Sequence, residues 1–303
     1  MDKKELQHKI RNMLKEKNGV LLVHYYQRGE IQDIADILGD SLKLSFGAAQ
    51  TAADVIVFAG VHFMAESASI ICPDKAVLLP RLDAGCPLAD TIAEEQLINM
   101  RKDYPGVPVV SYVNSSARIK ALSDACCTSS NALKVVNSFE GHQKIIMTPD
   151  VNLARYVAGL TDKKIIPWEG YCPVHHFLSV AHIRKLKKKH MGAPFAAHPE
   201  CRSDVLAEAD FIGSTEAIIR FAGESGAEKI IIGTEVGILH QLHKQYPKKT
   251  FIPASDDLIC RTMKLITLED IVCALSEMKN IIKVPEEISV PSRKALDRML
   301  AVP

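Results

Sequence analysis

The 303-residue sequence lacks several features that would place it in other classes of protein. Its basic residues outnumber its acidic residues by only one, so no global charge attracts nucleic acid or an anionic membrane. No apolar run approaches the roughly 20 residues that a membrane-spanning helix needs. The opening segment, MDKKELQHKI, has no apolar stretch typical of a signal peptide. We therefore expect a cytoplasmic protein that binds neither nucleic acid nor membrane.

The eight cysteines also lack the spacings of common metal and redox motifs. No C-x-x-C occurs, which excludes the usual zinc-ribbon and thioredoxin signatures, and the radical-SAM spacing C-x-x-x-C-x-x-C is missing too. In a reducing compartment, eight cysteines indicate metal binding or catalysis by a subset rather than a disulfide framework.

Three of the cysteines, Cys86, Cys172 and Cys260, recur at intervals of 86 and 88 residues. Each follows a proline that closes an apolar strand, in VLLPRLDAGC, IIPWEGYC and FIPASDDLIC. Another apolar strand with a polar tip precedes each cysteine, in VLLVHYYQ, VPVVSYVNSS and APFAAHPEC. The distances from tip to cysteine are 62, 60 and 62 residues, counted from His24, Tyr112 and His198. This period indicates three copies of one unit.

The predicted fold class is α/β, with three homologous α/β/α sandwich domains that have short parallel sheets and surround a central active site on a pseudo-threefold axis. Short β-branched runs alternate with helical stretches, which is typical of parallel sheets covered on both faces. Each unit is expected to read strand, helix, strand, helix, strand. The expected domains are residues 1–86 with an N-terminal helix, 87–172 and 173–260. Residues 261–303 form a tail that packs on the outside and could complete the first unit.

A hydroxyl residue follows each strand tip by 17 positions, at the start of an expected helix. The three residues are Ser41, Ser129 and Thr215. We expect each to cap its helix, where free backbone N–H groups bind anions such as carboxylate or phosphate.

The strand tips carry titratable side chains, and ligands of parallel sheets bind beyond the carboxyl ends of the strands. His198 and Glu200 point to the same side because side chains alternate along a strand, which brings together an imidazole and a carboxylate for proton transfer. His175 and His176 follow Cys172 directly; one is expected to contact substrate and the other to pack.

Three thiolates at equivalent positions of three units predict a trigonal site for a soft metal: zinc, copper(I) or an iron–sulfur cluster. Four cysteines ordinarily hold a 4Fe-4S cluster, so three would leave one iron open as a Lewis acid. Zinc on three cysteines would also leave an open position. The spacing alone does not choose among these metals.

Taken together, the motifs resemble the quinolinate synthase family in HYYQ with GDS, SYVNSSA with CCTSSNA, WEGYCPVH, HPEC with GST, and the spaced cysteines. The resemblance covers nearly the whole chain. It implies one 4Fe-4S cluster per chain, held by Cys86, Cys172 and Cys260. It also implies condensation of iminosuccinate (iminoaspartate) with dihydroxyacetone phosphate to quinolinate, phosphate and water in NAD biosynthesis. The iminosuccinate would come from an L-aspartate oxidase or dehydrogenase.

The resemblance further implies roles for single residues. Tyr26, Tyr112 and Glu200 match positions assigned to proton transfers, and His198 joins them as the imidazole beside Glu200. The residues expected to bind substrate are His24, Ser41, Tyr112, Val113, Asn114, Ser129, His175, His198, Pro199, Glu200 and Thr215.

Other functions remain open on the residues alone. A radical enzyme like those of diphthamide synthesis also uses three cysteines on three units, but it would not need this set of hydroxyl, histidine and glutamate side chains. A different dicarboxylate dehydratase is a second alternative. A cluster-based redox sensor would have a fully ligated cluster, and a zinc-organised structural module is the fourth alternative.

Overall fold

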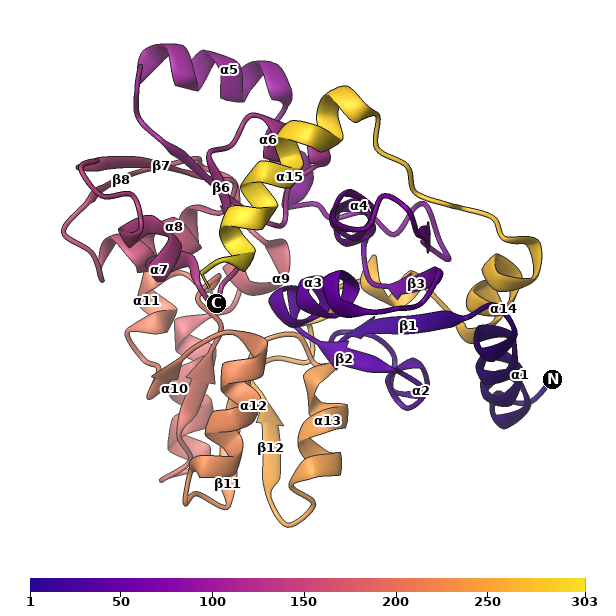
Figure 1. The fold of residues 1–303 in the computed structure, drawn as a ribbon. Helices are drawn as coiled ribbons and strands as arrows, with labels where there is room; N and C mark the ends of the chain where they lie inside the picture. The colour runs from indigo at the N-terminus through magenta and orange to yellow at the C-terminus, as the bar shows by residue number, and fades with distance from the viewer. Residues whose placement is uncertain (303) are drawn as a thin grey trace.

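The computed structural model describes residues 1–302 and contains three parallel sheets of four strands each (Figure 1). The strand orders are β2-β1-β3-β4, β6-β5-β7-β8 and β10-β9-β11-β12. Each sheet therefore has the same topology, with the first strand of the unit at its centre. The α/β fold with three α/β/α units is confirmed.

The strands fall into the three sheets in chain order. They are β1 (Gly19–His24), β2 (Ile37–Gly39), β3 (Val55–Ala59) and β4 (Ala76–Leu78); β5 (Val109–Tyr112), β6 (Ala125–Cys127), β7 (Lys144–Thr148) and β8 (Lys164–Pro167); and β9 (Phe195–Ala197), β10 (Phe211–Ile212), β11 (Lys229–Gly233) and β12 (Thr250–Pro253).

Helices connect these strands and cover the sheets. They are α1 (Lys3–Glu16), α2 (Gly29–Gln32), α3 (Ser41–Gln50), α4 (His62–Ile71), α5 (Glu94–Asp103), α6 (Ala117–Ala121), α7 (Ala132–Asn137), α8 (Val151–Ala158), α9 (Pro173–His176), α10 (Val180–Lys189), α11 (Ser203–Leu206), α12 (Thr215–Glu224), α13 (Ile238–Gln245), α14 (Leu268–Glu277) and α15 (Glu286–Leu300), with two 3-10 turns at Ala89–Thr91 and Met263–Leu265.

The central strands are buried on both faces, as near-continuous apolar runs predict. Leu21, Leu22 and Val23 of β1 have no exposed surface. Leu22 pairs with Ile37 of β2 on one side and with Phe58 of β3 on the other, both in parallel. The strands of each sheet are parallel, so their carboxyl ends lie at the same end of the sheet. The site described below lies at these ends.

The sequence-based prediction of three strands per unit is wrong by one strand. It missed β2, β6 and β10, which have only two or three residues each and show no periodic pattern of their own. These strands pair through main-chain bonds to the central strands, and that pairing depends on the folded unit rather than on local sequence.

A carboxylate accepts a backbone N–H of the central strand in each unit. In all three cases the distance is 2.8 Å and the carboxylate stands 15 residues after the N–H that it accepts. The pairs are Leu21 with Asp36, Val109 with Asp124, and Phe195 with Asp210. The repeat therefore extends to the end of the sheets opposite the strand tips.

The C-terminal tail contacts the first two units. Helix α14 packs against α1, and residue Ile281 forms an antiparallel bridge with Leu78 that covers the β4 edge of the first sheet. Helix α15 then lies against α4 and α6 (Figure 1), where the Ser292 hydroxyl donates to the Ala117 carbonyl at 2.7 Å. The tail thus joins the first unit to the second.

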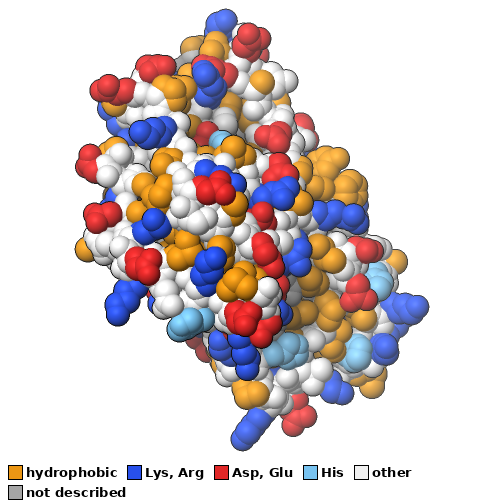
Figure 2. All heavy atoms as spheres, turned by 90° about the vertical axis from the view of Figure 1, so that its right-hand side faces the viewer, with side chains coloured by type: hydrophobic (Ala, Val, Ile, Leu, Met, Phe, Trp, Pro, Cys, Tyr) orange, Lys and Arg blue, Asp and Glu red, His pale blue; other side chains and the backbone are white. Residues whose placement is uncertain are grey.

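Within residues 1–302, no helix has the length and apolar character needed to cross a membrane. Figure 2 shows basic and acidic side chains interspersed over the face that carries α1 and α14. That distribution agrees with a net charge of +1.

Candidate active site

Side chains from all three units line one central cavity at the strand tips. The lining includes these residues from the predicted site: His24, Tyr26, Ser41, Cys86, Tyr112, Asn114, Ser129, Cys172, His175, His198, Glu200, Thr215 and Cys260. Val113 and Pro199 are not among the lining residues. They connect the cavity residues on either side of them, and the N–H of Val113 donates to the Cys127 carbonyl at 2.8 Å.

The hydroxyl residues are not the helix caps, which corrects the sequence-based expectation. Asp40 caps α3 by accepting the Lys43 N–H at 3.0 Å, and Ser214 caps α12 by accepting the Ala217 N–H at 3.4 Å. Ser41 and Thr215 therefore occupy the first helical position. Because the preceding residue makes the capping bond, their hydroxyls are not needed for capping and can face the cavity.

Ser129 differs from its two counterparts. It stands in the loop before α7, two residues ahead of Asn131, which is the residue at the start of that helix. Asn131 Oδ1 accepts the Thr128 N–H at 2.8 Å and holds this loop against the cavity. The second unit therefore presents its hydroxyl from a loop rather than from a helix.

The thiols of Cys86, Cys172 and Cys260 enter the cavity from the loops after β4, β8 and β12. Burial raises the pKa of Cys86 to about 12, and the nearby Cys260 thiol adds to the rise. Burial and the Glu200 carboxylate raise the pKa of Cys172 in the same direction. With no cation beside them, these cysteines are therefore protonated thiols near pH 7.

The spacing of these thiols bears on which metal they fit. A tetrahedral zinc ion with bonds of about 2.3 Å to sulfur holds its sulfur ligands within about 4 Å of one another. Among residues 1–302, the three cysteine sulfurs do not form a group with all members within 4.8 Å. The three sulfurs therefore do not have the spacing of ligands on a single zinc ion.

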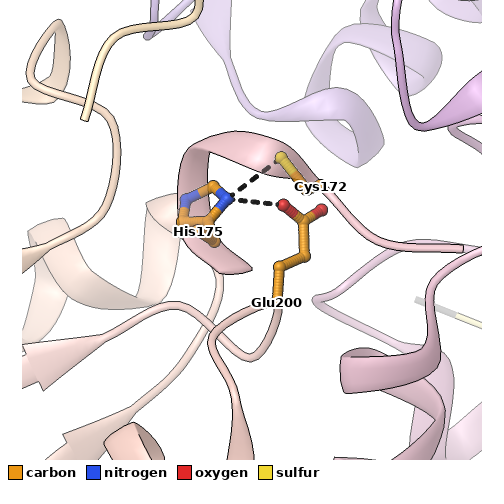
Figure 3. Close-up of side chains that lie close together, drawn as sticks. All are labelled: Cys172, His175 and Glu200. Carbon is orange, nitrogen blue, oxygen red and sulfur yellow. Dashed lines mark hydrogen bonds and ion pairs between the residues drawn. The ribbon is translucent and has the colours of Figure 1, made fainter. Parts of the chain in front are cut away.

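One compact group of potential ligands consists of Cys172, His175 and Glu200 (Figure 3). Nδ1 of His175 lies 2.7 Å from Oε2 of Glu200 and 3.4 Å from Sγ of Cys172. The first distance is that of a short hydrogen bond rather than of two ligands on one ion, because ligands about 2 Å from zinc lie about 3.3 Å apart. The group is therefore an acid–base pair beside a thiol.

His175 continues into a chain of hydrogen bonds that crosses the cavity wall. Its Nε2 lies 2.9 Å from the Thr234 hydroxyl, which in turn lies 2.7 Å from the Tyr26 hydroxyl. Tyr26 also contacts the Thr215 hydroxyl at 2.9 Å. All members are buried or half-buried, so a proton at Tyr26 and one at Glu200 are linked without bulk water.

The model of the family described as quinolinate synthetase A matches residues 8–301. A quinolinate synthase of Geobacter sp. (strain M21) is 55% identical over 303 residues, covering 100% of this chain and 99% of the relative. Quinolinate synthase 1 of Methanosarcina acetivorans is 52% identical over 302 residues, with coverage of 100% and 99%. The quinolinate synthase of Alkaliphilus metalliredigens is 51% identical over 294 residues, or 97% of each chain.

The chain belongs to the quinolinate synthetase A family. The resemblance inferred from the sequence motifs is confirmed, and the chain is an enzyme. The cavity of this family member is accordingly its candidate active site.

The two tip histidines of this quinolinate synthetase A family member are neutral near pH 7. Burial, together with the smaller effect of Lys264, lowers the pKa of His24 to about 3. Burial likewise lowers the pKa of His198 to about 3, although Glu200 opposes the shift. Nδ1 of His24 accepts the Tyr26 N–H at 3.1 Å, so its Nε2 carries the proton and can donate to a ligand.

Glu200 remains ionised in spite of its burial. Burial would raise the pKa of this carboxyl, but the facing His198 and His175 and the Tyr112 hydroxyl hold it below its usual range. Burial and Glu200 in turn raise the pKa of Tyr112 well above 10. The family member thus has a carboxylate base next to a neutral phenol that can donate a proton.

One further observation points to a ligand in this cavity. The side-chain oxygen of Asn114 is buried and has no hydrogen-bond partner within the described residues, so a bound donor would satisfy it. Asp40 accepts hydrogen bonds from the Ser130 hydroxyl at 2.9 Å and from Ser214, which joins all three units at the cavity rim. Asp40 is a member of the site that the sequence reasoning missed.

Thr234 was also missed, although the repeat contains a signal for it. It stands 36 residues after His198, as Thr148 stands 36 residues after Tyr112, and each follows or ends the third strand of its sheet. A comparison of the three units at every position, and not only at the strand tips, hydroxyl residues and cysteines, would have identified Thr234.

Proposed function

We propose that this chain is a quinolinate synthase, which condenses iminosuccinate with dihydroxyacetone phosphate to quinolinate and releases inorganic phosphate and two waters. The observation that carries the proposal is the single cavity shared by three thiols, Glu200 and Tyr112. The full-length relatives named quinolinate synthase support it.

The residues that would hold a 4Fe-4S cluster are Cys86, Cys172 and Cys260. When bound on three thiolates, such a cluster supplies an open iron that acts as a Lewis acid for loss of a hydroxyl group. The three half-buried thiols share one cavity, and their sulfurs are too far apart for a single zinc ion, which supports this group.

Substrate binding falls to polar groups around the cavity. The substrates carry two carboxylates and one phosphate, and the N-termini of α3 and α12 with the hydroxyls of Ser41 and Thr215 suit anions. Ser129 adds a third hydroxyl. Neutral His24 and the Asn114 amide orient the remaining polar atoms of the substrates.

Proton transfers fall to the buried acid–base groups. Glu200 is ionised and can take a proton from carbon during enolisation of the triose phosphate. Tyr112 and Tyr26 are protonated phenols that can donate to leaving hydroxyls. His198 faces Glu200, and the chain through His175 and Thr234 returns a proton to Tyr26.

The supply of iminosuccinate follows from its chemistry. An imine with two carboxylates hydrolyses readily in water, so an L-aspartate oxidase or dehydrogenase has to produce it in the same compartment. None of the eight cysteines forms a disulfide in the described part of the chain, which supports a reducing compartment such as the cytoplasm.

The test is anaerobic purification and reconstitution with iron and sulfide, followed by an assay with dihydroxyacetone phosphate and iminosuccinate made in place from L-aspartate by an oxidase. We expect about four irons per chain and formation of quinolinate. A cluster-loaded chain that forms no quinolinate contradicts the proposal. A requirement for S-adenosylmethionine would favour the radical enzyme instead.

A further inference from the structure

The backbone of one candidate cluster ligand is held by a buried carboxylate. The N–H of Cys172 donates to Oδ2 of Asp150 at 3.0 Å. The other oxygen of Asp150 accepts the Leu153 N–H at 2.7 Å and caps α8. Asp150 is only 2% exposed, so both bonds lie away from water. The carboxylate therefore ties the cysteine loop to the end of β7.

The loop that carries Cys172 also approaches this segment closely. The N–H of Val151 donates to the Gly170 carbonyl at 2.7 Å. A Cβ atom at Gly170 would lie 2.5 Å from the Pro149 carbonyl oxygen, which leaves room only for glycine. These contacts fix the position of the Cys172 loop relative to Asp150.

The third unit repeats the arrangement with a glutamate. The N–H of Cys260 donates to Oε1 of Glu235 at 3.1 Å, and the other oxygen of Glu235 accepts the Gly237 N–H at 2.6 Å. Glu235 has no exposed surface and pairs with Lys264 at 3.1 Å. It stands two residues after the end of β11, just as Asp150 stands two residues after the end of β7.

The first unit is built differently. The residues after β3 are Gly60, Val61 and His62, none of which is an acid. There the connection to the cysteine loop is a backbone bond, from the His62 N–H to the Ala84 carbonyl at 2.8 Å. The carboxylates of the other two units are therefore additions to the repeated fold rather than a requirement of it.

We propose that Asp150 and Glu235 are positioning residues that fix Cys172 and Cys260 for binding the cluster. The inference rests on the proposed iron–sulfur function. Each carboxyl group connects the residues after a strand to the cysteine N–H, so the backbone of the cysteine is fixed and its thiol has one orientation. Substituting outer groups of this kind costs about 10–100-fold in metal affinity.

The test compares Asp150→Asn and Glu235→Gln with Asp124→Asn as the matched control. Asp124 also accepts a backbone N–H at 2.8 Å, from Val109 at the opposite end of the sheet. Each amide retains one acceptor oxygen and replaces the other with a donor, so Asp150→Asn can still cap α8. After anaerobic reconstitution we would measure iron and sulfide per chain, iron release to bathophenanthroline disulfonate, and the electron paramagnetic resonance spectrum of the reduced cluster.

We expect iron release to be about tenfold faster, with an altered spectrum, in both site variants and wild-type behaviour in Asp124→Asn. Equal release from all four chains, or equally fast release from the control, overturns the positioning role. If Asp150→Asn fails to fold, Asp150→Ser retains a capping oxygen and takes its place. A wild-type chain that takes up no iron overturns the proposed function as well, whereas a loaded wild type with unaffected variants overturns only the positioning role.

Discussion

Nδ1 of His175 lies 2.7 Å from Oε2 of Glu200, and both side chains are almost completely buried. His175 stands on the short helix α9 directly after a candidate cluster ligand, and Glu200 stands three residues after the end of β9. This contact places the acid–base pair of the candidate active site next to the thiol of Cys172.

Replacing Glu200 with glutamine should reduce kcat by about 10²–10⁴-fold, because an amide can bond to His175 but cannot take up a proton. The measurement is quinolinate formation by the cluster-loaded variant. Glu208→Gln, which removes a carboxylate paired with Arg184 at the surface, should retain full activity. A Glu200→Gln enzyme within threefold of the wild type would rule out Glu200 as the base.

Thr234 should matter through its hydroxyl group. Thr234→Val removes the link between His175 and Tyr26 at nearly constant volume, so we expect kcat to fall at least tenfold. Thr234→Ser preserves the hydroxyl and should remain close to wild-type activity. Steady-state kinetics of both variants, loaded with equal iron, will show whether the hydroxyl or only the volume is needed; equal activities would exclude the relay.

Each of the variants Cys86→Ser, Cys172→Ser and Cys260→Ser should lose the cluster and the activity together, since two remaining thiolates cannot hold it. Cys273 lies on α14, where its thiol contacts Glu277 rather than the cavity. Cys273→Ser should therefore bind iron and form quinolinate as the wild type does. Iron and sulfide analysis with the activity assay provides the readout, and a loss of iron from Cys273→Ser would count against the assignment.

Acid should destabilise the apoprotein through its buried histidines. The pKa values of His24 and His198 are about 3 in the folded chain and about 6.5 when unfolded, so the unfolded state binds more protons between these values. The free energy of unfolding should decrease as pH falls below 6.5, by up to about 1.4 kcal/mol per pH unit for each histidine. Urea unfolding at pH 5 to 7 measures this slope.

Other groups titrate in the same range, so the decisive comparison is with a variant. His24→Asn should reduce the change in the free energy of unfolding per pH unit by nearly the contribution of one histidine. His8 lies on the exposed face of α1, and His8→Asn should leave the slope unchanged. Identical slopes for the wild type and His24→Asn would contradict a buried neutral imidazole at that position.

Much of the architecture follows from short-range patterns in the sequence. Apolar strands such as Val20–Val23 fill both faces of a sheet, so their composition alone indicates parallel β-structure between helices. The two-residue strand β10 has no such pattern, and only its bonds to β9 define it. The capping residues of α3 and α12 were misassigned by one position because neighbours such as Asp40 and Ser41 can both accept an N–H, and backbone geometry selects one.

By itself, the sequence determined the three repeated units, because motifs that recur at a fixed period indicate copies of one unit. Only the tertiary structure decided which groups touch across the units. The contacts of His175 with Glu200 and Thr234, and of Asp150 and Glu235 with the cysteine backbones, join residues 22 to 59 positions apart. Their distances depend on how strands and loops pack, and packing is a property of the whole fold.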